Sequence, residues 1–387
     1  MSDNRPANNP NQPRQVPLLD LPRQQAEFSA EIDEALKRVT SGAAYILGPE
    51  VKMLEQQLAS YLGVAHCSGV ASGTDALVIA LRALAIVRTG KEYFSPDDEV
   101  IVPSFTFTAS GEAVLHAGAT PVFVDIDPAT FNINPEAAAA AVNSHTIGLM
   151  PVHLFGNPCP MDAIMELARK HDLFVVEDVA QAFGASFGPS KLGSFGTGAF
   201  SFFPSKNLGG FGDGGAVTTG EEELATVIRM LRTHGGRDKY NAEHIGYNSR
   251  LDTLQAAVLL VKLKHVERLN RCRRAIASYY DQHLCGLDWL TLPSAVPGGE
   301  HVYNQYTVRV LNGKRDLVQE KLREKGIGTA VYYPVPLHRM NLFAGRCKTA
   351  GSLEQTERAC AEVLSLPIEP LLTEAELAYV VQCLRDL

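Results

Sequence analysis

A single lysine, Lys206, stands among aromatic, small and glycine residues in the run SFFPSKNLGGFGDGG, which extends from Ser201 to Gly215. Upstream, two acids, Glu177 and Asp178, close an apolar stretch with the pattern of a buried strand. A desolvated lysine loses its proton more readily and can form an imine, while a carboxylate facing a pyridine nitrogen keeps that ring cationic. The pair predicts a Schiff base between Lys206 and pyridoxal phosphate, with Asp178 at the ring nitrogen. Taken alone, Lys206 would more often mark a surface turn, and Asp178 fits a helix cap equally well.

Several small and polar residues could hold the phosphate of such a cofactor. Ser72, Gly73 and Thr74 immediately precede an apolar helical pattern, where free backbone N–H groups and a hydroxyl favour an anion. Ser201 lies shortly before the lysine, and Asn248 opens a later helical pattern with an amide donor. The alternatives are an ordinary helix cap by Ser72 or Thr74 and a turn residue at Asn248.

Two further residues could contact the cofactor ring. Phe107 follows a predicted strand, at the end where ligands gather in parallel sheets, and could stack on a flat ring. Gln181 follows the two acids and could donate to the phenolic oxygen of the cofactor. The alternative for Phe107 is a place in the core, as for most aromatic residues.

The elements that must position these residues alternate between strand and helix. Short apolar runs predict strands at 99–102, 121–124, 147–152 and 173–176, and 3.6-residue periodicity predicts helices at 74–84, 109–117, 135–142 and 162–170. This order predicts βαβ units and a mostly parallel sheet. Residues 199–203 and 215–219 read as an antiparallel pair near its edge, joined by the lysine loop, and 85–96 reads as an extended surface loop.

The domain organisation follows from changes in pattern along the chain. Residues 1–15 are predicted to form a disordered lead-in, 16–265 a large cofactor-binding domain with an N-terminal arm, and 266–387 a smaller C-terminal α/β domain. A long amphipathic helix over 252–284 is expected to bridge the two domains.

Composition narrows the function classes. The 387 residues carry a net charge of −8 and 45% hydrophobic residues, which is typical of a globular enzyme and disfavours nucleic acid as a partner. No apolar run is long enough to span a membrane, and the N-terminus lacks the apolar core of a secretory signal. Seven dispersed cysteines without CxxC spacing, and histidines without ligand spacing, disfavour a metal site. We therefore expect a cytoplasmic enzyme with no metal.

In combination and in this order, these motifs resemble the DegT/DnrJ/EryC1/StrS family of sugar aminotransferases. The resemblance rests on SGTDAL at 72–77, the stretch 103–109, the acids with Ala180 and Gln181, SFFPSK at 201–206, and YNSRLDTLQAA at 247–257. It covers nearly the whole chain from about Val16, and the main departures are residues 1–15 and the insertion 85–96. It implies an aspartate-aminotransferase-like α/β fold (fold type I), with a mostly parallel seven-stranded sheet.

The resemblance also implies roles for the candidate residues. Lys206 would carry the cofactor and shuttle a proton, Asp178 would pair with the pyridine nitrogen, and Gly73, Thr74 and Ser201 would hold the phosphate. Asn248 would reach the phosphate in a neighbouring subunit, so that a homodimer would share its active sites. L-glutamate would be the amino donor, and a nucleotide-linked keto sugar the acceptor.

The substrate subgroup is read from two further stretches, 45–51 and 331–338. Both resemble family members that aminate C3 of a 3-keto sugar nucleotide, including a UDP-2-acetamido-3-keto uronic acid; C4 amination is the alternative. Tyr332, Tyr333 and His338 are therefore candidate sugar contacts, with a proline-fixed loop of packed tyrosines as the alternative. Arg237 and Lys239 could bind a uronate carboxylate, or simply lie in a solvated charged loop.

Two rival functions remain. A regulator that keeps the fold without catalysis is disfavoured by the joint presence of Lys206, Asp178 and the phosphate set. A related dehydratase is disfavoured because such enzymes replace the lysine with histidine or add an iron–sulfur cluster.

Overall fold

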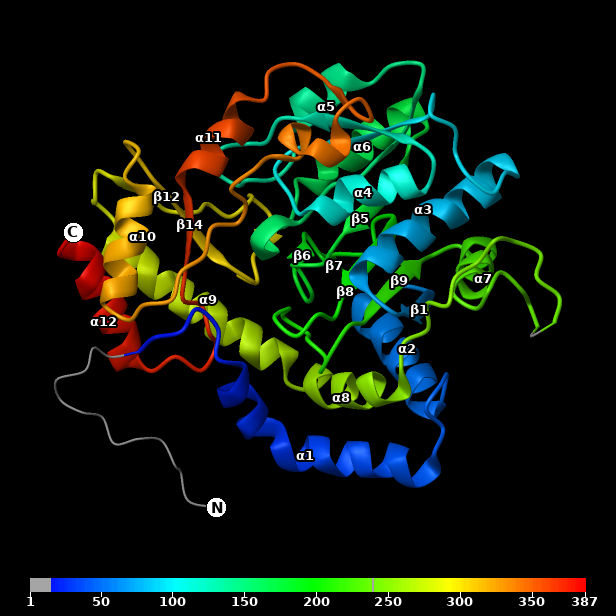
Figure 1. Cartoon of the computed structure of the whole chain (residues 1–387), viewed down its shortest axis with the longest axis horizontal. Helices are drawn as coiled ribbons and strands as arrows, with labels where there is room; N and C mark the ends of the chain where they lie inside the picture. Colours follow the sequence, from blue (N-terminus) through cyan, green and yellow to red (C-terminus); the bar gives the residue numbers. More distant parts are fainter. Residues whose placement is uncertain (1–14, 239) are drawn as a thin grey trace.

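The computed structural model describes residues 15–238 and 240–387 and is built around one large sheet (Figure 1). The strand order is β1-β9-β8-β5-β4-β2-β3-β13. The strands are β1 His66–Val70, β2 Glu99–Pro103, β3 Thr120–Val124, β4 Thr146–Leu149, β5 Phe174–Asp178, β8 Thr197–Ser201, β9 Gly215–Thr219 and β13 Lys348–Thr349. The family resemblance implies seven strands, and the two-residue β13 adds an eighth because it pairs with β3 at the edge.

All neighbouring pairs in this sheet are parallel except those that β9 makes with β8 and β1. The antiparallel pair joined by the lysine loop is thus confirmed. Because β1, β2, β4, β5 and β8 share one direction, their carboxyl ends lie at the same edge of the sheet. This edge carries the residues that follow β1, β2, β5 and β8, and ligands of open α/β sheets bind at such an edge.

Two helical layers cover the sheet, and alternate residues of each strand face them. One layer packs against Val100, Val102 and Val176 and consists of α3 Gly73–Thr89, α4 Thr108–His116 and α7 Glu222–Leu231. The other packs against Ile101 and Val175 and consists of α2 Pro49–Leu62, α5 Pro135–Ala141, α6 Met161–His171 and α8 Thr253–Leu263. Apolar helix faces on both sides explain why the strands read as continuous apolar runs.

A second, three-stranded sheet lies at the other end of the molecule (Figure 1). Its strands are β10 Leu290–Thr291, β12 Tyr306–Val310 and β14 Val363–Leu366. Its core includes residues of α9 Val266–Leu284, α10 Arg315–Glu324 and α12 Glu374–Arg385. The remaining elements are α1 Leu21–Gly42, which packs against α8, α11 Glu354–Glu362, the short strands β6 Ser186–Phe187, β7 Ser190–Lys191 and β11 Gly299–Glu300, and the 3-10 turns η1 Leu154–Gly156, η2 Leu337–Arg339 and η3 Asn341–Phe343.

Three sequence expectations need correction. The single helix over 252–284 is two helices, α8 and α9, which separate at Lys264 and His265 although no proline or glycine marks the break. Tertiary packing decides it, because α8 packs on α1 and α2 whereas α9 packs on α12. Strand β1 was missed, since only its last three residues are buried.

The insertion 85–96 is not an extended surface loop. Helix α3 continues through its first part to Thr89, and its second part carries Phe94 into the core. The Phe94 ring stacks on Phe174 at a centroid distance of 5.6 Å, and its N–H donates to the carbonyl of Ala117. The predicted lead-in falls, except for residue 15, outside the residues that the structure describes.

Candidate active site

Lys206 lies in the loop that leaves β8, and this loop is held from several sides. The Lys206 N–H donates to the carbonyl of Phe203 at 2.8 Å. The next side chain, Asn207, donates to Asn270 at 2.7 Å and to the carbonyl of Val302 at 3.1 Å. Burial lowers the pKa of the Lys206 amine, and the charge of Asp178 partly opposes this shift. A lysine with a lowered pKa is more often neutral and can act as nucleophile and base.

Asp178 ends β5 and is buried, with 5% of its surface exposed. Ser110 donates to one carboxylate oxygen at 2.7 Å, and the N–H of Ala180 donates to the other at 3.1 Å. Burial raises the pKa of Asp178, whereas Ser110, Ala180 and the charge of Lys206 lower it. The carboxylate is therefore fixed in direction and lies within the electrostatic reach of Lys206.

Glu177 precedes Asp178 and points to the other side of the strand, where it holds a loop. Its carboxylate accepts hydrogen bonds from the N–H groups of Gly193, Phe195 and Gly196 at 2.8 to 3.1 Å. His153 also contacts it at 3.3 Å, and because the Nδ1 atom of His153 accepts from Cys159 N–H, its Nε2–H is free to donate. The two adjacent acids thus have separate roles, and only Asp178 belongs to the candidate site.

The start of α3 and the end of β8 meet closely. A Cβ atom on Gly73 would lie 2.5 Å from the Cβ atom of Ser201, so that any other residue would force the two elements apart. The hydroxyl of Ser72 caps the helix by accepting from the N–H of Asp75 at 3.0 Å, as the capping alternative predicts. Thr74 and Ser201 remain as candidate hydroxyl donors, beside N–H groups of the first turn that have no partner within the helix.

Gln181 and Tyr333 form the opposite side of the site. Gln181 accepts from the N–H of Phe155 at 2.7 Å and donates to the hydroxyl of Tyr333 at 3.1 Å. The ring of Tyr333 lies 6.0 Å from that of Phe107. Phe105 is 1% exposed and belongs to the core, whereas Phe107 is 55% exposed and presents a free ring. Gln181 therefore links the cofactor candidates to the sugar candidates.

The other predicted sugar contacts have different surroundings. Tyr332 is partly buried beside Tyr333, at a ring distance of 5.8 Å. His338 has both ring nitrogens occupied, by Ser104 at 2.8 Å and Glu357 at 3.2 Å. These contacts give His338 a role in holding the loop 331–338 against the end of β2.

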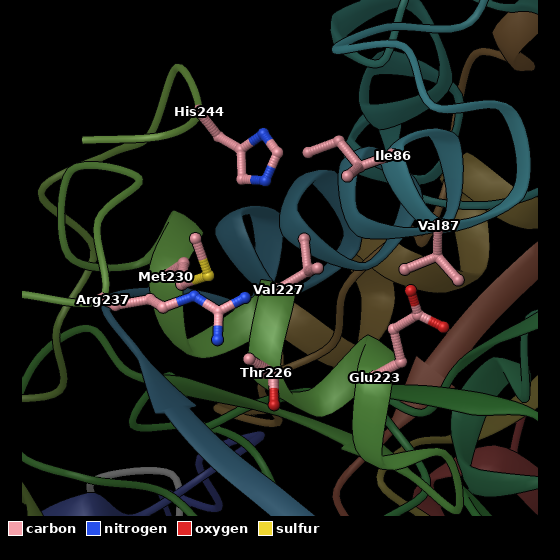
Figure 2. A pocket seen from close by; sticks show the side chains of 8 residues that line it. All are labelled: Ile86, Val87, Glu223, Thr226, Val227, Met230, Arg237 and His244. Atoms are coloured by element: carbon pink, nitrogen blue, oxygen red, sulfur yellow. The ribbon is translucent and has the colours of Figure 1, made fainter. Parts of the chain in front are cut away.

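Arg237 and Asn248 are exposed residues of the segment 233–250 between α7 and α8, of which the structure describes residues 233–238 and 240–250. Arg237 pairs with Glu243 at 3.1 Å and lines an open pocket of about 360 Å³ (Figure 2). The pocket lining contains none of the cofactor candidates; it consists of Ile86, Val87, Glu223, Thr226, Val227, Met230, Arg237 and His244. Asn248 is exposed, and its backbone pairs with Thr233. Lys239 lies outside the described residues.

Sequence reasoning missed Ser110, which binds the carboxylate of Asp178. Ser110 lies on α4, and its hydroxyl is also 3.1 Å from that of Thr106. A signal existed, because a serine one helical turn after Phe107 faces the same way as the residue chosen for the ring. Within the described residues no group of three or more metal-ligating side chains occurs, and no helix could span a membrane.

Comparison with known proteins decides the family. A model of the DegT/DnrJ/EryC1/StrS aminotransferase family matches residues 26–385. The chain belongs to this family. It is therefore a sugar aminotransferase that depends on pyridoxal phosphate.

Three relatives of this aminotransferase illustrate the range of the family. A "Pleiotropic regulatory protein" of Geobacillus stearothermophilus is 45% identical, covering 96% of this chain and 98% of its own length. A UDP-N-acetyl-3-dehydro-alpha-D-glucosamine 3-aminotransferase of Acidithiobacillus ferrooxidans is 44% identical, covering 96% and 97%. The crystal structure of DesV from S. venezuelae, in complex with a ketimine intermediate, has a TM-score of 0.91 and 44% identity, covering 96% and 98%.

The residues present fit pyridoxal phosphate. Because Gly73 has no side chain, the start of α3 packs directly against Ser201, which brings the free N–H groups of the first helical turn and the Ser201 hydroxyl close together, as a phosphate requires. A buried carboxylate suits a protonated pyridine nitrogen, and a free phenylalanine ring suits a flat heterocycle. The residues that end or follow β1, β2, β5 and β8 thus bring an amine, a carboxylate, a hydroxyl and an aromatic ring to one edge of the sheet.

Proposed function

We propose that this aminotransferase transfers the amino group of L-glutamate to C3 of a nucleotide-linked 3-keto sugar. The observation that carries the proposal is that a buried Lys206 lies within electrostatic reach of a buried, hydrogen-bonded Asp178, while Ser201 on the strand before the lysine meets the start of α3 at Gly73. The substrate class is supported by the Acidithiobacillus relative, whose name specifies a 3-dehydro sugar nucleotide.

When bound, pyridoxal phosphate supplies an aldehyde that condenses with amines and a ring that accepts an electron pair. Lys206 Nζ would hold the aldehyde carbon between turnovers. Once glutamate displaces it, Lys206 would take the α-proton of the donor and deliver it to C4′, first as base and then as acid. Its lowered pKa favours the neutral amine that the first step requires.

Asp178 would keep the ring nitrogen protonated during this transfer. Its own burial opposes ionisation, and Ser110 and the N–H of Ala180 offset that cost by bonding the charged form. Thr74 and Ser201 would hold the phosphate, and Phe107 would stack on the ring. One water would be consumed when the donor leaves as 2-oxoglutarate and one released when the keto sugar takes up the nitrogen, so that an amino and an oxo group would be exchanged overall.

We further propose a homodimer in which Asn248 of one subunit completes the phosphate site of the other. The exposure of Asn248 supports this, because its side chain is accessible to a second subunit. Several large apolar side chains are also exposed and suit a subunit interface; they are Tyr45, Ile46, Leu47, Phe203, Phe211 and Ile245.

Tyr333 is the best-supported sugar contact, because it bonds Gln181 and lies beside Phe107. Arg237 remains the candidate for a uronate carboxylate, and it would have to exchange Glu243 for that ligand. The proposed substrates therefore include, but are not restricted to, a UDP-2-acetamido-3-keto uronic acid.

A reverse assay tests the substrate. The purified enzyme, 2-oxoglutarate and a panel of UDP- and dTDP-linked 3-amino and 4-amino sugars are incubated, and released glutamate is measured. We expect turnover with 3-amino sugars only. Turnover confined to 4-amino sugars would replace C3 with C4 amination.

A non-catalytic regulator is the second candidate, favoured by the name of the Geobacillus relative. It predicts no light absorption at about 420 nm in the purified protein, whereas the Schiff base predicts a band there that borohydride abolishes.

A further inference from the structure

Arg82, in the middle of α3, is a charged residue with no exposed surface. Its guanidinium donates to the carbonyl and the carboxylate of Glu92 at 2.6 and 3.0 Å, to the carbonyl of Ile245 at 3.0 Å, and to the hydroxyl of Tyr247 at 2.7 Å. It also lies 3.6 Å from the centroid of the Tyr93 ring. A buried charge is tolerated only with such a complete set of partners. The hydrogen bonds of Arg82 therefore fix α3, the insertion and residues 245–247 relative to one another, since any other arrangement would leave the buried charge without partners.

Glu92 holds the same segment from the insertion. Beside its bond to Arg82, its carboxylate accepts from the ring of His244 at 2.8 Å and from the N–H of Ile245 at 3.2 Å. Phe94, two residues further along the chain, is buried in the core, which restricts the movement of the backbone at Glu92. The insertion thus connects α3 to residues 244 and 245 through the hydrogen bonds of Glu92.

A second anchor lies just beyond. The hydroxyl of Ser249 donates to Asp75 at 2.6 Å and accepts from the N–H of Ala71 at 3.2 Å, which ties it to the start of α3. Between the two anchors lies Asn248, whose side chain is exposed and has no hydrogen-bond partner among the described residues. Both neighbours of Asn248 are held by side-chain hydrogen bonds, so its backbone, and with it the origin of its side chain, is positioned before it meets any ligand.

We propose that Arg82 and Glu92 are positioning residues that hold Asn248 ready for the cofactor phosphate of the neighbouring subunit. The inference rests on the shared-site homodimer of the proposed function. An exposed segment without anchors would have to be ordered on binding, and anchoring it beforehand removes that entropic cost. The insertion 85–96 therefore acts on the partner's site rather than on that of its own subunit.

A tagged heterodimer shows whether the insertion acts on the active site of the partner subunit or on that of its own subunit. One subunit carries Asn248→Ala and keeps Lys206; the other carries Lys206→Ala and keeps Asn248. Borohydride then traps cofactor at a single site, where Lys206 of the first subunit meets Asn248 of the second. The half-saturating concentration of pyridoxal phosphate is measured at this site with Glu92→Gln placed in either subunit. Tyr247→Phe is the milder variant, and Arg229→Gln is the matched control, because its pair with Glu222 lies on α7, apart from residues 244–249.

We expect Glu92→Gln to raise the half-saturating concentration about tenfold when it stands in the subunit that supplies Asn248, and to leave it unchanged in the other. Tyr247→Phe should raise the half-saturating concentration about threefold when it stands in the subunit that supplies Asn248. Arg229→Gln should leave this concentration unchanged in both subunits. An equal effect in both subunits, or an effect only in the subunit that supplies Lys206, would overturn the inference. The absence of any trapped adduct in the wild-type protein would instead refute the proposed function.

Discussion

The carboxyl edge of the large sheet and the exposed segment 233–250 carry the two halves of the candidate site, and they are built differently. At the edge, Asp178 and Lys206 are held by bonds within one chain. In the segment, residues 244, 245, 247 and 249 are anchored by hydrogen bonds, whereas the functional candidates Arg237 and Asn248 are exposed. Under the proposed function, one subunit would supply the groups that carry out the chemistry, whereas the segment would contribute to cofactor affinity and substrate specificity. Variants in the two regions should fail in different ways.

The largest effect is expected at the edge. Lys206→Ala should lower transamination by at least about 10⁴-fold, because both the covalent attachment and the proton shuttle are lost. Circular dichroism and thermal unfolding should show an intact fold. Near-wild-type turnover would refute the role of Lys206.

Asp178→Asn compared with Glu177→Gln tests the division between the adjacent acids. Asp178→Asn should lower kcat by about 10²–10³-fold, since the ring nitrogen loses its charged partner. Glu177→Gln should instead lower the free energy of unfolding by about 1–3 kcal/mol, because three N–H groups lose a charged acceptor. Equal losses of kcat in both variants would contradict the assignment.

Gly73→Ala tests the close contact between the start of α3 and Ser201. The added Cβ atom would lie 2.5 Å from that of Ser201, so the affinity for pyridoxal phosphate should fall by about 10–100-fold. Gly42→Ala is the matched control, because nothing lies within 4 Å of its Cβ position. Equilibrium titration of absorbance gives both affinities, and equal values would remove Gly73 from the site.

Asn248→Ala tests the outer segment. It should weaken retention of the cofactor by about tenfold, the size of one lost hydrogen bond to a phosphate, while borohydride trapping at saturating cofactor stays unchanged. Loss of trapping at saturating cofactor would show that Asn248 is needed for Schiff-base formation, and would contradict the separation between the residues of the edge and those of the segment.

The smallest effect concerns pH. Because burial lowers the pKa of Lys206 and Asp178 raises it, the condensation of the apoprotein with pyridoxal phosphate should rise with pH and level off below the pH expected for an exposed lysine. Asp178→Asn removes the raising cause, so its midpoint should shift to lower pH by about one unit or less. Stopped-flow absorbance across pH measures the midpoint, and a shift to higher pH would contradict the electrostatic account.

The sequence carries a stronger signal for the candidate residues of the edge than for those of the segment, for a physical reason. Lys206, Asp178 and Gly73 are required by the cofactor's chemistry, so their types and order along the chain carry the signal. The hydrogen bonds from Ser110 to Asp178 and from Gln181 to Tyr333 join elements far apart in the chain, so the sequence could suggest these residues but not their partners. The insertion was misread because its local composition is that of a loop, although the buried Phe94 could have indicated contact with the core.

The central claim is that Lys206 is the lysine that binds the cofactor covalently. A second buried lysine, Lys262, is the alternative attachment site. Lys262 is also buried, donates to the carbonyl of Gly209 at 2.8 Å in the same loop, and has a pKa lowered to about 8 by burial. The purified holoenzyme is reduced with borohydride, digested, and its labelled peptide sequenced by mass spectrometry. We predict the pyridoxyl group on Lys206. A label on Lys262, or no label at saturating pyridoxal phosphate, would contradict the account.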